Sequence, residues 1–166
     1  MKGITIAFYK GRGLRRDKII RWWTKSPYSH VELIMPNGTM TGITPPDHPV
    51  IRTKKLGGIE RSDWDFPKAD WDFIDIRVTE CQLNSLRAFI ENTRGQGYDW
   101  IGMIASHLTP FKIRTPNKWY CSEWVAYALS VSKILTWKQL KLYDVPKMPP
   151  GRLFDVLRSS VEIELN

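Results

Sequence analysis

The sequence predicts an α+β fold in which a small antiparallel β-sheet packs with helices. The chain has 166 residues, of which 42% are hydrophobic, and its aromatic residues are spread along its length. Two local patterns set the fold class: a β-hairpin around the turn Pro36-Asn37-Gly38 and an amphipathic helix after Thr79. No repeat, low-complexity stretch or linker indicates a second unit. We therefore expect one domain over residues 1–166.

The first half of the chain is predicted to be mainly β. Gly11 and Gly13 separate a first strand from a short helix, on which we expect Ile19, Ile20 and Trp23 to share one side. A proline-rich loop follows the hairpin. The expected elements are a strand over 4–8, a helix over 17–23, hairpin strands over 28–35 and 39–43, a loop over 45–49, and strands over 50–53 and 73–78.

The second half is predicted to be mainly helical. Thr79 and Gln82 have the spacing of a capping box, and the apolar residues after them recur at helical intervals up to Gly95. The remaining expected elements are a short helix over 98–107, a basic loop over 109–118, a helix over 120–130, a helix over 150–157 and a closing strand over 161–165.

Charge and cysteine content limit the function classes. The net charge is +8 and the two cysteines, Cys81 and Cys121, form no C-x-x-C pair. Disulfides and structural zinc are not expected, and the residues call for no cofactor. No apolar run reaches the roughly 18 residues of a membrane span, so we expect a soluble, cytoplasmic protein without a transmembrane segment. The sequence leaves the oligomeric state open.

Basic residues gather in and before the first predicted helix. A face of this kind attracts an anionic polymer or surface, such as nucleic acid, anionic lipid or cell-wall polymer, and it can equally be a solvated helix face. These residues are Lys10, Arg12, Arg15, Arg16, Lys18 and Arg21.

The segment Trp119 to Leu129 places Cys121 in the first turn of a helix, directly after an irregular loop. Free N–H groups and the positive dipole end at such a position favour a thiolate and can stabilise an oxyanion. A buried structural cysteine is the alternative interpretation.

The strand over 28–35 carries two polar residues in an otherwise apolar run. Alternation puts His30 and Glu32 on one face and Val31 and Leu33 on the other. A thiolate is one partner that would suit such a histidine, and backbone groups are the alternative. We expect the other histidines, His48 and His107, to face solvent.

Four motifs occur in an order that resembles the circularly permuted NlpC-type, papain-like hydrolases, the YiiX-like group. They are Ser29-His30-Val31, Gly97-Tyr98-Asp99, Tyr120-Cys121-Ser122-Glu123 and Pro149-Pro150-Gly151-x-Leu153. The resemblance covers about residues 4–157. It implies a papain-like cysteine hydrolase of peptidase or amidase type, with Cys121 as the nucleophile at a helix N-terminus and His30 as the general base.

The third polar residue departs from the pattern. Such families supply it from the strand after the histidine strand, where Thr41 lies here. Glu32 is the carboxylate on the same face as His30, so we expect Glu32 to assist His30, and Thr41 stays the alternative. Glu123 is expected to serve the helix N-terminus. In this mechanism the thiolate attacks an acyl carbon and water releases the acyl group.

Other functions stay open at this point. An alcohol or amine in place of water would make the same site an acyltransferase, and a thioesterase would use it unchanged. The scaffold could also be a catalytically inactive, basic binding module for nucleic acid or a cell-envelope polymer, or a phage or toxin-like effector. Peptide, isopeptide, peptidoglycan and lipid ester substrates all remain. The acidic run Asp63, Asp65, Asp70, Asp72 and Asp75 fits no metal-binding loop and is expected to be solvated surface.

Overall fold

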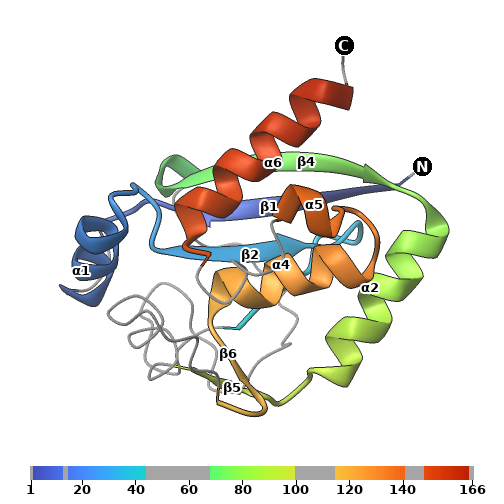
Figure 1. The fold of residues 1–166 in the computed structure, drawn as a ribbon, viewed down its shortest axis with the longest axis horizontal. Helices are drawn as coiled ribbons and strands as arrows, with labels where there is room; N and C mark the ends of the chain where they lie inside the picture. The colour runs from blue at the N-terminus through green and yellow to red at the C-terminus, as the bar shows by residue number, and fades with distance from the viewer. Residues whose placement is uncertain (1, 13–14, 44–67, 100–114, 141–147, 165–166) are drawn as a thin grey trace.

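The computed structural model describes residues 2–12, 15–43, 68–99, 115–140 and 148–164. Within them the chain is a mixed α+β structure, as predicted (Figure 1). Several predicted features lie outside the described residues. These are the loop over 45–49 with His48, the strand over 50–53, Asp63, Asp65, His107, and most of the segments 98–107 and 109–118.

An antiparallel sheet of four strands forms the centre of the fold, in the order β3-β2-β1-β4. The strands are β1 (Lys2–Tyr9), β2 (His30–Ile34), β3 (Met40–Thr41) and β4 (Trp71–Val78). The predicted hairpin is confirmed, and Gly38 at its turn has a φ of 82°, a conformation that favours glycine. A 3₁₀ turn, η1 (Lys68–Asp70), leads into β4.

Helices complete the fold and cover the sheet. They are α1 (Arg15–Thr24), α2 (Glu80–Asn92), α4 (Cys121–Val131), α5 (Trp137–Leu140) and α6 (Pro150–Glu164). In Figure 1, α4 runs across β2 and α6 crosses over β1 and β4 on the same side. A short parallel pair, β5 (Gly97–Tyr98) and β6 (Lys118–Trp119), lies next to the start of α4.

One large hydrophobic cluster joins the sheet to α2, α4 and α6. Alternate residues of β1 and β2, such as Ile6 and Leu33, pack in it with Trp124 of α4. These three side chains are fully buried. Full burial of one large apolar side chain contributes about 1.5–3 kcal/mol to the free energy of unfolding. The cluster therefore holds α4 firmly against β2.

Three sequence predictions differ from the structure. Residues 161–164 continue α6 instead of forming a strand, because no helix breaker follows Leu157 and helices propagate readily once formed. Tyr98 begins no helix, since it pairs with Trp119 in β5 and β6. On α1, Ile19 is exposed whereas Ile20 and Trp23 are half-buried, although the three were expected to share one side, because periodicity alone does not tell which residues meet the protein.

Candidate functional site

Cys121 is the first residue of α4, and His30 is the first residue of β2. The charge and hydrogen bond of the Cys121 side chain are among the influences that raise the pKa of His30. The Nε2 atom of His30 lies 3.1 Å from Oε1 of Glu32. The structure thus brings the three predicted residues into one chain of contacts, thiol to imidazole to carboxylate. Each of the three is about 2% exposed.

The ring nitrogens of His30 have separable roles. A carboxylate oxygen only accepts hydrogen bonds, so Nε2 is the nitrogen that carries the proton toward Glu32. In the neutral imidazole the other nitrogen, Nδ1, then carries the lone pair. The Glu32 contact therefore sets which nitrogen of the neutral ring can accept a proton.

The surroundings of His30 favour its charged form. Burial opposes protonation of the ring, but the charge and hydrogen bond of Cys121, followed by those of Glu32, raise the pKa of His30 from 6.5 to about 10. Desolvation alone would lower it. The contacts of the ring thus outweigh its burial, and an imidazolium is the stable form near neutral pH.

Glu32 and Thr41 were the two candidates for the third residue, and the strand register separates them. Thr41 pairs with Leu33, so its side chain lies on the Leu33 side of the sheet. Its Oγ1 is buried and has no hydrogen-bond partner among the residues that the structure describes. The carboxylate on His30 is that of Glu32.

Sequence reasoning missed the role of Gly42, which lies across from Glu32. A Cβ atom at position 42 would be 3.0 Å from Cγ of Glu32 and 3.5 Å from its Cβ. A larger residue would require the Glu32 side chain to give way by a few tenths of an ångström. The only sequence signal for this role was that Gly42 directly follows Thr41, the alternative third residue, at the end of β3.

The start of α4 is held by two polar contacts to the backbone of Met148. Tyr120 takes the N-cap position with no side-chain cap, and its hydroxyl accepts from the N–H of Met148 at 3.1 Å. Ser122 Oγ donates to the carbonyl of Met148 at 2.7 Å. The segment before α6 is therefore fastened to the first turn that carries Cys121.

The four motifs that carried the resemblance meet around this turn. The N–H of Asp99 donates to the carbonyl of Trp119 at 2.8 Å, and the Asp99 carboxylate accepts from Thr115. Gly151, at the start of α6, lies against Ser26 just before the histidine strand, and a Cβ there would collide with the Ser26 hydroxyl. Contacts thus link segments that are far apart in sequence.

The acidic run is part of the sheet rather than of the site. Asp72 pairs with Lys10 at 2.6 Å and accepts from the Tyr28 hydroxyl at 2.8 Å, and Asp75 accepts from Thr5. Across the described part of the chain, no group of three His, Cys, Asp or Glu side chains could hold a metal ion. These aspartates join neighbouring elements, while Asp63 and Asp65 lie outside the described residues.

Comparisons with known proteins return nothing for this chain. No protein-family model, no curated protein and no solved structure matches it. Any assignment of function consequently depends on the site itself.

Proposed function

We propose that this protein is a cysteine hydrolase of peptidase or amidase type, with Cys121 as nucleophile, His30 as base and Glu32 as the residue that orients His30. The observation that supports this most strongly is the buried chain of contacts from Cys121 through His30 to Glu32. The permuted NlpC-type, papain-like resemblance agrees with the same three positions.

The cost of the arrangement is an argument for function. Taking an imidazole and a carboxylate out of water costs several kcal/mol for each ion, and apolar residues of similar size would often be as stable or more stable there. Buried titratable groups with shifted pKa values next to a nucleophile are typical of active sites. A purely structural cysteine needs neither partner.

In the proposed reaction, His30 holds the proton of the Cys121 thiol as an imidazolium, and the thiolate attacks the carbonyl carbon of the substrate. The C–S bond forms, the carbonyl oxygen becomes an oxyanion, and the N-terminal N–H groups of α4 stabilise it. Collapse expels the amine, which takes its proton from the His30 imidazolium. Water, with His30 as base, then cleaves the thioester and returns the thiol. An alcohol or amine at this last step would make the reaction an acyl transfer.

The first test is alkylation by iodoacetamide between pH 5 and 9. Mass spectrometry reads Cys121 and the exposed Cys81 separately, so Cys81 is a matched control inside every molecule. Because Cys121 is buried, the shape of its pH profile is compared, not its absolute rate. We expect alkylation of Cys121 to persist toward acidic pH and that of Cys81 to fall away.

The His30→Ala protein decides the matter. We expect it to lose the acidic reactivity of Cys121 and to keep the Cys81 profile unchanged. With p-nitrophenyl acetate, the wild-type protein should also gain one acetyl group on Cys121, and His30→Ala should form this acyl-enzyme on the order of 10²–10⁴ times more slowly. Identical Cys121 profiles in the two proteins would refute the catalytic pair.

A further inference from the structure

Helix α1 presents two of its apolar residues to solvent and buries its acid. Trp22 is 82% exposed and Ile19 is 58% exposed, whereas Asp17 is 2% exposed. Residues three apart on a helix are neighbours, so Ile19 and Trp22 form one continuous outward surface. An ordinary surface helix turns its apolar side to the core, whereas on α1 the other apolar residues, Ile20 and Trp23, are only half-buried.

Polar contacts on the inner side fix this orientation. The guanidinium of Arg21 donates to the carbonyls of Lys10 and Arg12, each at 3.2 Å, and to that of Gly11 between them. These bonds attach α1 to the segment that follows β1. A rotation that buried Trp22 would break them, so the outward position of the tryptophan belongs to the fold.

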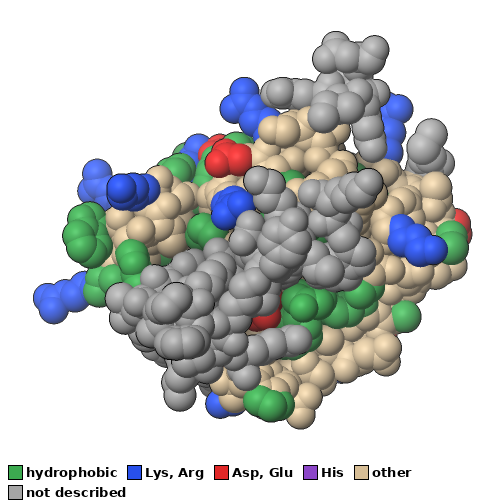
Figure 2. Space-filling view, viewed as in Figure 1, with side chains coloured by type: hydrophobic (Ala, Val, Ile, Leu, Met, Phe, Trp, Pro, Cys, Tyr) green, Lys and Arg blue, Asp and Glu red, His purple; other side chains and the backbone are tan. Residues whose placement is uncertain are grey.

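The exposed apolar pair lies among positive charges. Arg15 and Lys18 are exposed on the same helix, and Arg12 and Lys25 are exposed just before and after it. Among the side chains described over residues 10–12 and 15–25, no acidic side chain is exposed. Figure 2 shows hydrophobic and basic side chains next to one another at the edge where α1 lies.

We propose that the outward face of α1, formed by Arg15, Lys18, Ile19 and Trp22, docks on an anionic lipid bilayer surface. Helices that lie in a membrane interface combine tryptophan and aliphatic side chains with a basic rim in this way. Cations near an anionic bilayer surface add about 1 kcal/mol each.

Two features favour lipid over nucleic acid. Nucleic acid binding relies on stacking of bases on aromatic faces, to which the aliphatic Ile19 contributes nothing. Both Ile19 and Trp22 gain by entering the acyl boundary of a bilayer. The proposal depends on the exposure and charge of α1 and is independent of the chemistry at Cys121.

The test is co-sedimentation of the full-length protein with vesicles of phosphatidylcholine alone or mixed with phosphatidylglycerol. We expect binding only to the anionic vesicles, and weaker binding as the salt concentration rises. The double variant Ile19→Ser, Trp22→Ser should lower the partition coefficient at least about tenfold. Lys18→Gln should lower it about fivefold.

Val131→Ser is the matched control, because Val131 is an exposed apolar residue, 45% exposed, on α4. We expect it to bind as the wild type does. Circular dichroism and the denaturation midpoint check that each variant is folded. We expect them to be folded, because the substituted positions are exposed. The proposal is overturned if the wild type binds neither vesicle or if the double variant binds as well as Val131→Ser. It is also overturned if a single-stranded oligonucleotide displaces the wild-type protein from the vesicles.

Discussion

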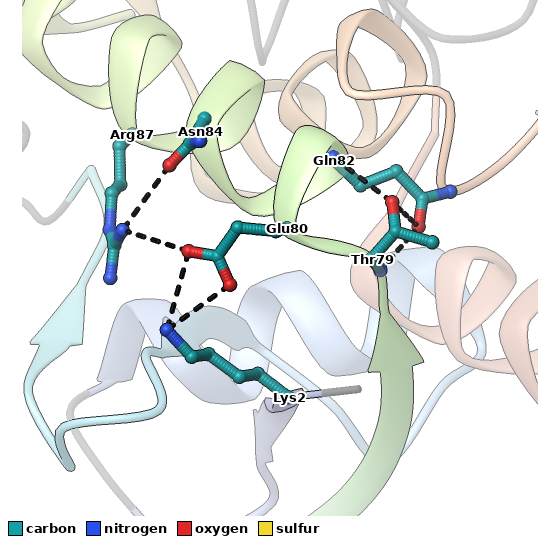
Figure 3. Close-up of polar contacts among 6 residues, drawn as sticks. All are labelled: Lys2, Thr79, Glu80, Gln82, Asn84 and Arg87. Atoms are coloured by element: carbon teal, nitrogen blue, oxygen red, sulfur yellow. Dashed lines mark hydrogen bonds and ion pairs between the residues drawn. The ribbon is translucent and has the colours of Figure 1, made fainter.

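Two helix N-termini in this molecule each carry a cysteine, and they differ in what surrounds it. At α2, Thr79 accepts from the N–H of Gln82 at 3.2 Å and donates its own N–H to the Gln82 side chain at 2.9 Å, a complete capping box. Glu80 adds ion pairs to Lys2 and Arg87 (Figure 3). Cys81, the second residue of α2, is exposed.

At α4 the cap is absent and the cysteine has partners. Tyr120 provides no side-chain cap, and Cys121 is buried against His30. Both thiols are near the positive end of a helix dipole, so the dipole does not distinguish them. What distinguishes them is burial, together with the His30 and Glu32 pair on β2. The two sites can therefore be compared within one protein.

The largest expected effect is the pH dependence that His30 gives to stability. Its pKa is about 10 in the folded protein against 6.5 in the unfolded chain. A raised pKa contributes stability that is complete below about 6.5 and is lost as the pH rises toward about 10. A difference of one in pKa between the folded and unfolded states corresponds to about 1.4 kcal/mol. Urea denaturation across this range should show the free energy of unfolding falling with pH.

The variants sharpen this prediction. His30→Gln should remove the part of the slope that His30 contributes, and Cys121→Ala should reduce it, because the charge and hydrogen bond of Cys121 raise the pKa of His30. Cys81→Ala should leave the slope as in the wild type. Equal slopes in wild type and His30→Gln would contradict the raised pKa.

Glu32→Gln should have the next largest effect. The amide removes the charge that helps to hold the His30 imidazolium and no longer enforces the tautomer, so acylation of Cys121 should slow on the order of 10²-fold. The pKa of His30 should also fall, because the hydrogen bond and charge of Glu32 help to raise it.

Glu80→Gln is the matched control, since it removes a carboxylate from the first turn of α2. We expect its Cys121 profile to be unchanged. Unchanged turnover and pH profile in Glu32→Gln would remove the orienting role of Glu32. Gly42→Ala, which presses on Glu32 without altering its charge, should give a smaller loss of the same kind.

Local patterns predicted the elements that depend on short-range contacts. The capping box at Thr79, the hairpin turn at Gly38 and the helix start at Cys121 all follow from neighbours within a few residues. The pairing of His30 with Glu32 also follows from alternation along one strand. These parts could be predicted because the chemistry that determines them is adjacent in sequence.

Long-range contacts determined the features that were missed or wrong. Tyr98 joins a strand because Trp119 lies beside it, and Gly42 matters because Glu32 lies across from it. The carbonyls that Arg21 reaches fix the orientation of α1, so Ile19 is exposed although periodicity grouped it with the half-buried Ile20 and Trp23. Residues 161–164 have an alternating pattern, yet helix α6 continues through them.

The smallest effect concerns the capped helix. Thr79→Ala removes the side chain that accepts from Gln82 and should lower the free energy of unfolding by about 1 kcal/mol, measured by urea denaturation. Ser85→Ala, at an exposed position inside α2, should change it by less than about 0.5 kcal/mol. Cys121 alkylation should be the same in both variants. If Thr79→Ala altered the Cys121 profile as His30→Ala does, the two helix starts would be coupled, and the reactivity of Cys121 would depend on the stability of α2 instead of its own partners.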